Sequence, residues 1–98
     1  MKVISLDLIK KNSRIDGDEE DDYLVYLGAV SEQMVEDMLN RSWDDVYASH
    51  GEYPAPLCQA CLMLVDHLYK HRGATTTMSV DQVPFGVSAM VKHYVNLL

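Results

Sequence analysis

An apolar stripe of helical period, running from Leu24 to Leu39, constrains the fold of this chain more than any other feature. At 100° per residue its apolar and small residues fall on one face about 140° wide. The polar residues of the same stretch fall on the opposite face, namely Glu32, Gln33, Glu36 and Asn40. This pattern is typical of an amphipathic helix packed on a core, and we expect the helix to run from about Asp18 to Arg41.

An acidic run, with six acids in the seven residues from Asp16 to Asp22, leads directly into this stripe. Acidic side chains in the first turn of a helix complement the positive end of the helix dipole and cap free N–H groups. A calcium loop is excluded because its sixth position holds Asp21 instead of glycine, and its twelfth holds Leu27 instead of glutamate. We interpret the run as a helix start, with a partner contact as the alternative.

Three further segments have helical patterns. A short helix is expected over residues 5–12, with Ser5 as its N-cap. The segment from Pro54–Pro56 to Arg72 is apolar around most of its circumference, which predicts the central, most buried helix, with Gly73 as its stop. A last helix is expected over residues 87–98. The sequence therefore predicts one all-α domain over residues 1–98, a small bundle of three main helices and a short N-terminal helix, joined by two long loops at 42–56 and 73–86.

Composition excludes several classes of protein. The hydrophobic fraction of 48% argues against disorder, and the net charge of −7 disfavours direct binding to nucleic acid. No apolar run approaches the ~20 residues of a membrane helix, and the N-terminus does not resemble a signal peptide. We therefore expect a cytoplasmic protein with no membrane contact.

Two cysteines and two histidines, Cys58, Cys61, His67 and His71, have the residue types of a zinc site but not its spacing. They lie on one predicted helix and point in different directions, and Cys58 and His71 are about 20 Å apart along it. We expect buried structural cysteines, no metal and no cofactor. A metal or redox protein, with His67 and His71 joined by a ligand from elsewhere, is the weakest of three alternatives. No phosphate loop, nucleophile elbow or His-Glu-x-x-His motif is present, which predicts that the chain is not an enzyme.

Aromatic side chains are frequent in the first expected loop, which holds Trp43, Tyr47 and Tyr53. One interpretation is that they fold back and cover the bundle. The other is that some of them anchor a neighbouring protein, because Trp and Tyr dominate interface hot spots. The apolar C-terminal residues Leu97 and Leu98 suggest in the same way that the last helix docks on the bundle or on a neighbour.

Three stretches follow one another in an order typical of one protein family. The first, LDLIKKNSRIDGDEEDDYL (6–24), has a short amphipathic helix, Arg-hydrophobic-Asp and an acidic run. The second, PLCQACLMLVDHLYKHRGA (56–74), is a buried helix with Pro at its start and Tyr-x-x-Arg at its end, and the third, VPFGVSAMVKHY (83–94), is a Pro-Phe-Gly turn into a last helix. Together they resemble the head–tail connector proteins (head-completion or adaptor proteins) of tailed bacteriophages and prophages. Ser13, where an apolar residue is usual, and the pair Cys58 and Cys61 depart from the family pattern.

The resemblance implies a structural role without catalysis or cofactor. Such a subunit would form a ring of about a dozen copies in the neck of the virion, assembled in the host cytoplasm. The ring would join the portal protein to a tail-side connector or stopper protein and let DNA pass without specific binding. The main alternative is a small helical regulatory or adaptor module. The residues expected at a subunit or partner interface are Arg14, Asp16, Asp18, Asp21, Trp43, Tyr47, Tyr53, Phe85, Tyr94, Leu97 and Leu98.

Overall fold

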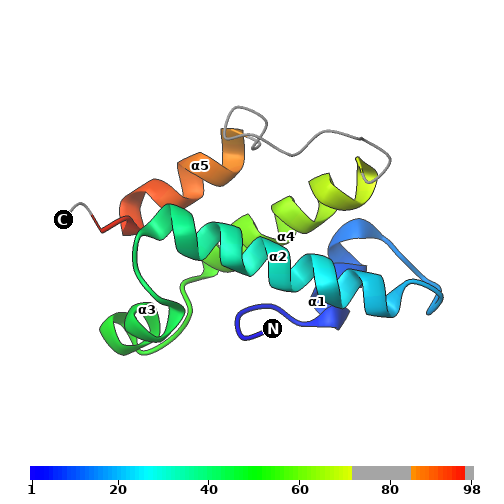
Figure 1. Ribbon diagram of the computed structural model, residues 1–98, viewed down its shortest axis with the longest axis horizontal. Helices are drawn as coiled ribbons and strands as arrows, with labels where there is room; N and C mark the ends of the chain where they lie inside the picture. Colours follow the sequence, from blue (N-terminus) through cyan, green and yellow to red (C-terminus); the bar gives the residue numbers. More distant parts are fainter. Residues whose placement is uncertain (72–84, 97–98) are drawn as a thin grey trace.

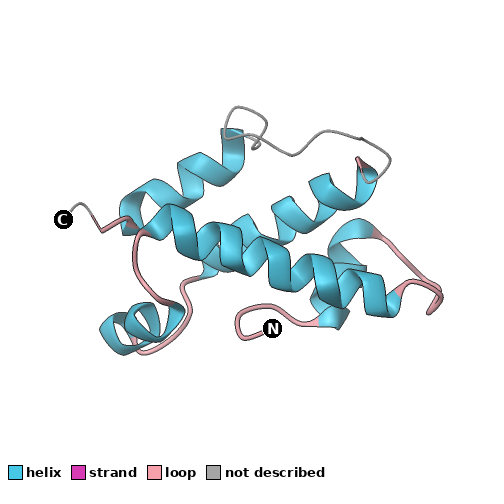
Figure 2. Ribbon diagram, viewed as in Figure 1, coloured by secondary structure: helices cyan, strands magenta, loops and turns pink. Residues whose placement is uncertain are grey.

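Helices account for all of the regular structure in the part of the chain that is described. The computed structural model describes residues 1–71 and 85–96, with the side chain of Phe85 left out. Its elements are α1 (Leu6–Ser13), α2 (Asp21–Leu39), α3 (Trp43–His50), α4 (Ala55–Lys70), α5 (Phe85–Val91) and the 3-10 turn η2 (Lys92–Tyr94) (Figures 1 and 2). The predicted all-α class is confirmed.

The central helix is α4, as its apolar circumference predicts. It packs against α1, α2 and α5 (Figure 1). Leu57, Cys61 and Leu64 on α4 are fully buried. Burying an aliphatic side chain of this size contributes about 1.5–3 kcal/mol, so α4 supplies much of the free energy that holds the bundle. The helix ends at Lys70, two residues earlier than expected.

The turn between α1 and α2 is longer than expected, because α2 begins later than its sequence pattern predicts. The predicted short helix is confirmed: the Ser5 side chain accepts a hydrogen bond from the Leu8 N–H at its start. Arg14 ends it in the left-handed conformation, with φ of 56°. Helix α2 begins at Asp21, three residues later than expected, and Glu20 at its N-cap makes no side-chain capping bond. Asp21 and Asp22 therefore occupy the first turn, and the earlier acids belong to the loop.

Helix α3 lies inside the segment expected to be a loop, so that expectation is wrong. Ser42 caps its start by accepting a hydrogen bond from the Asp45 N–H at 3.1 Å. Gly51 ends it at φ of 75°, a left-handed conformation that glycine adopts without steric cost. Trp43 and Val46, three residues apart, are the two buried side chains of the helix. Two buried side chains one turn apart are too few to produce a clear helical period in the sequence.

The last helix is shorter than expected. Helix α5 begins at Phe85 and ends at Val91, whereas a helix over 87–98 was expected. After η2 the backbone becomes extended at Val95, and the Asn96 N–H donates a hydrogen bond of 2.8 Å to the Leu39 carbonyl. The chain leaves the helix because it docks on the C-terminal end of α2. The rest of the second expected loop, up to residue 84, lies outside the described residues, as do Leu97 and Leu98.

Ser31 on α2 has a buried hydroxyl group whose loss of hydration is not offset by a hydrogen bond among the described residues. It is fully buried, and its hydroxyl has no hydrogen-bond partner among the described residues. Because an unmade buried hydrogen bond costs free energy and alanine is the better helix former, we expect Ser31→Ala to raise the free energy of unfolding by about 1 kcal/mol. Thermal denaturation should show a rise in Tm of roughly 4–8 °C. A fall in Tm would mean that the hydroxyl has a partner in solution.

Candidate partner interface

The acidic turn is fastened to the chain's own first helix. The Lys10 ammonium lies 2.9 Å from a carboxylate oxygen of Asp18 and 2.9 Å from one of Asp21. These hydrogen bonds, the one with Asp21 contributing most, raise the pKa of Lys10. Lys10 and Asp21 are therefore engaged within the subunit, and so is Asp18, although its side chain is 90% exposed. Of the expected interface residues, these two acids are already paired inside the chain.

Arg14 and Asp16 lie on the surface, in the turn between Lys10 and the acids that it binds. Both are exposed, while Ile15 between them packs against the core. The left-handed Arg14 lets the Ile15 N–H donate to the Lys10 carbonyl at 2.9 Å, which turns the chain sharply at the end of α1. A cation and an anion are thus held on a short, well-anchored turn, at the end of the molecule opposite to η2 (Figure 1).

The three aromatic residues of the expected loop form one cluster with different exposures. Trp43 is 3% exposed, and its indole N–H donates to the Glu32 carbonyl at 3.0 Å. The Tyr53 ring meets the Trp43 ring edge-on at 5.9 Å and the Tyr47 ring at 5.0 Å. Trp43 is buried and covers the bundle, as the first interpretation has it. Tyr47 is 49% exposed and is the member of the cluster that a neighbour can reach.

Glu32 is the residue whose role the helical wheel missed. It was expected on the polar face of α2, but it is 6% exposed. Its carboxylate accepts three backbone hydrogen bonds, from the N–H groups of Lys2, Val3 and Ile4, at 2.8, 2.9 and 2.9 Å. These bonds hold the N-terminal segment (residues 1–4) against α2 and bury the Ile4 side chain. No local pattern in the sequence signals this contact, because its donors are backbone groups 28 to 30 residues away.

Gly28 explains how the N-terminal segment approaches α2 so closely. A Cβ at this position would collide with the Met1 thioether and would lie 3.1 Å from the Ile9 side chain. A glycine in the middle of a helix costs roughly 0.5–1 kcal/mol relative to alanine. Here it provides the space in which α1 and the N-terminal segment pack on α2.

The C-terminal part of the described chain is held at the other end of α2. Asn40, in the left-handed conformation, ends α2, and its side-chain amide donates to the Asn96 carbonyl at 3.3 Å. The Tyr94 ring, half-buried, meets the His50 ring edge-on at 5.6 Å. Tyr94, one of the expected interface residues, thus packs against α3 within the subunit and keeps part of its surface exposed.

Several large apolar side chains are exposed on this acidic protein. Tyr26 is 62% exposed and stacks on Tyr23, one turn earlier on α2, with ring centres 6.4 Å apart. The others described are Met1, Leu8, Val25 and Tyr47. Surface hydrophobic residues scattered singly are normal, but Tyr26 and Tyr47 are of the residue type that interfaces favour. Sequence reasoning did not single out Tyr26, because it read this stretch only for its buried face.

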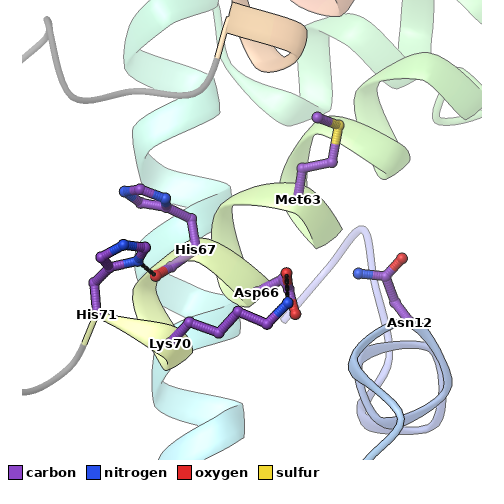
Figure 3. Close-up of a pocket in the computed structure, with 6 residues that line it drawn as sticks. All are labelled: Asn12, Met63, Asp66, His67, Lys70 and His71. Carbon is purple, nitrogen blue, oxygen red and sulfur yellow. Dashed lines mark hydrogen bonds and ion pairs between the residues drawn. The ribbon is translucent and has the colours of Figure 1, made fainter.

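A shallow hollow lies between α1 and the C-terminal half of α4 (Figure 3). On its floor the Asp66 carboxylate accepts a hydrogen bond from the Ser13 hydroxyl at 2.9 Å and pairs with Lys70 at 3.0 Å. His67 lies in the last turn of α4 and His71 is its C-cap residue. Burial, together with the adjacent His71, lowers the pKa of His67. The hollow is open to solvent, and both polar and apolar groups line it.

Cys58 and Cys61 do not form a metal site with His67 and His71. Cys61 is buried, and burial raises the pKa of its thiol well above its usual range. Burial also raises the pKa of Cys58. Both thiols are free; Cys61 is buried as expected, whereas Cys58 is only partly buried. Among the described residues, no group of three His, Cys, Asp or Glu side chains is placed to hold a metal ion.

No helix in the described ranges, 1–71 and 85–96, is both long enough and apolar enough to cross a membrane.

Comparison with known proteins identifies a matching family model. No curated protein and no solved structure matches the chain. A family model described as "Phage gp6-like head-tail connector protein" matches residues 3–94, which is nearly the whole chain. The proteins of this family are structural components of the virion that assemble with other head and tail proteins, and they are not enzymes. The chain therefore belongs to the phage gp6-like head–tail connector protein family.

Proposed function

We propose that this protein is the repeating subunit of a ring in the neck of the virion, between the portal protein and a tail-side connector or stopper protein. The observation that carries the proposal is the family match over residues 3–94. The ring contains about a dozen copies, and DNA passes through its centre. Assembly takes place in the host cytoplasm before the particle is complete.

The charge of the chain supports a passive role towards DNA. The net charge is −7, and like charge keeps a phosphate backbone from adhering. Of the cations in the described part, Lys10, Arg41 and Lys70 are each paired with an acid of the same chain. A ring built from such subunits lets DNA slide through it without a specific contact.

The subunit contacts that we propose use the side chains that folding leaves exposed. Arg14 and Asp16, of opposite charge, lie on the turn after α1, and Tyr47 lies on α3. Contacts between different patches of identical subunits produce rings when the rotation closes. Trp43, Asp18 and Asp21 contribute indirectly, by fixing α3 and the turn. Tyr53 and Tyr94 add their partly exposed edges, and Phe85, Leu97 and Leu98 complete the proposed contact set.

The first test is the mass and shape of the assembled protein. Light scattering behind a sizing column, over a range of concentrations and with and without portal protein, should show a species near a dozen times the subunit mass of 11.1 kDa. Negative-stain images of that species should show an annulus. A dimer at every concentration, unchanged by portal protein, would favour the adaptor-module alternative.

The proposed charge contact predicts a rescue by double reversal. If Arg14 of one subunit meets Asp16 of the next, Arg14→Glu weakens assembly because it places two acids opposite each other. Adding Asp16→Lys to the same chain restores the pair and therefore the ring. The readout is the fraction of annular species in the sizing column, measured at low salt, where surface charges are least screened.

The control for the reversal is Lys92→Glu, an exposed substitution on η2 with the same change in net charge. It should leave the annular fraction close to that of the unchanged protein. If Arg14→Glu behaves like this control, or if the double variant is no better than the single one, the contact between Arg14 and Asp16 does not exist.

A further inference from the structure

His67 and His71 are spaced as two ligands of one metal ion. His67 lies in the last turn of α4, His71 is the C-cap residue four positions later, and their ring centres are 4.3 Å apart. Two imidazoles bound to one ion in adjacent positions, at about 2.0–2.1 Å, hold their ring centres roughly 4–5 Å apart. The free protein therefore already keeps the two rings at the separation that shared coordination requires.

The backbone selects the form of His71 that can bind a metal. Its Nδ1 lies 2.8 Å from the His67 carbonyl oxygen (Figure 3). A carbonyl only accepts hydrogen bonds, so in the neutral imidazole that makes this contact Nδ1 carries the proton and Nε2 has the lone pair. Metal-binding histidines commonly donate their second ring N–H to a backbone carbonyl in this way, which fixes the ring and its tautomer.

The charged neighbours that the structure describes do not obstruct the pair. Asp66 and Lys70 bind each other at 3.0 Å and point towards α1, whereas the two imidazoles point away from it (Figure 3). His71 is exposed and His67 is partly exposed, so an ion reaches both from solvent.

We propose that His67 and His71 form a two-ligand site for a divalent transition metal of the Cu²⁺ or Ni²⁺ type, with water in the remaining positions. Nitrogen ligands in adjacent positions suit the square-planar or octahedral geometries of these ions, and among divalent ions Cu²⁺ binds such ligands most tightly. The ion is exchangeable and is not needed for folding. This inference goes beyond the proposed function and does not depend on ring formation.

The test uses Cu²⁺ and the full-length protein, above the ordinary histidine pKa of about 6.5, so that both imidazoles are neutral. Electron paramagnetic resonance during a Cu²⁺ titration should show one ion per chain with two imidazole nitrogens. Either His67→Gln or His71→Gln should weaken binding by about tenfold or more and remove one nitrogen from the spectrum, equivalent to at least about 1.4 kcal/mol. The matched control, His93→Gln, removes an exposed histidine from η2 and should leave both nitrogens in place.

Two results would overturn the proposal. The first is a wild-type spectrum without two imidazole nitrogens. The second is equal Cu²⁺ affinity in His67→Gln, His71→Gln and the wild-type protein, which would place the ion elsewhere, for example at the terminal amine. Circular dichroism of each variant shows whether α4 is intact, so loss of binding is separated from loss of fold.

Discussion

Replacing Trp43 by alanine is expected to lower the free energy of unfolding by about 3–5 kcal/mol, the largest effect of any substitution proposed for this chain. The indole is 3% exposed, and its removal leaves a cavity between α2 and α3. It also leaves the Glu32 carbonyl without the 3.0 Å hydrogen bond that the indole N–H donates. For a chain of 98 residues the Tm should fall by roughly 15–30 °C, measured by circular dichroism.

The control for Trp43→Ala is Tyr47→Ala in the same aromatic cluster. Tyr47 is 49% exposed, so its truncation should cost less than about 1 kcal/mol. A third variant, Trp43→Phe, keeps most of the ring and loses the hydrogen bond, and it should lie between the two. If Trp43→Ala costs no more than Tyr47→Ala, α3 is not packed on α2 in solution.

Trp43 also illustrates the limit of pattern reading in this sequence. The two long helices could be predicted from the sequence, because the apolar stripe of α2 and the apolar circumference of α4 extend over 19 and 16 residues. Helix α3 has eight residues and two buried positions, which is too few to establish a period. Its end signals, Ser42 and Gly51, were present in the sequence. They were outweighed by the prolines that follow, which belong to the start of α4.

Exposure was the property that the sequence could not supply for the candidate interface. Local physics correctly placed acids in the first turn of α2, and they favour that end of the helix dipole. It could not reveal that Lys10 binds two of the acids from another helix. The count of aromatic residues likewise did not separate the buried Trp43 from the exposed Tyr47. Such differences depend on tertiary contacts. The sequence could therefore name the candidate residues, but it could not separate the buried or paired ones from the exposed ones.

Helix α2 is the element to which both ends of the described chain are fastened. The N-terminal segment binds the Glu32 carboxylate near its middle, and Asn96 binds the Leu39 carbonyl at its end. Anchoring both ends on one long helix ties the positions of the two ends to each other. Helix α2 in turn packs on α4, the central helix.

Replacing Glu32 by alanine is expected to lower the free energy of unfolding by about 3 kcal/mol. The side chain accepts three backbone hydrogen bonds, and bonds to a charged group contribute about 1.5–3 kcal/mol each when fully buried. Only the bond from Ile4 is fully buried, and water satisfies the N–H groups of Lys2 and Val3 once the N-terminal segment detaches, so the total is less than their sum. The Tm should fall by roughly 10–20 °C.

A second measurement separates the loss of this anchor from general destabilisation. In the wild-type protein the Ile4 amide should be protected from hydrogen exchange, and Glu32→Ala should remove that protection while the amides of α4 stay protected. The control is Asp37→Ala, which removes an exposed acid of α2 whose carboxylate accepts a hydrogen bond from Gln33, and it should change the Tm little. If the Ile4 amide stays protected in Glu32→Ala, the buried Ile4 side chain alone holds the N-terminal segment. The carboxylate would then serve only to satisfy donors that packing had already placed beside it.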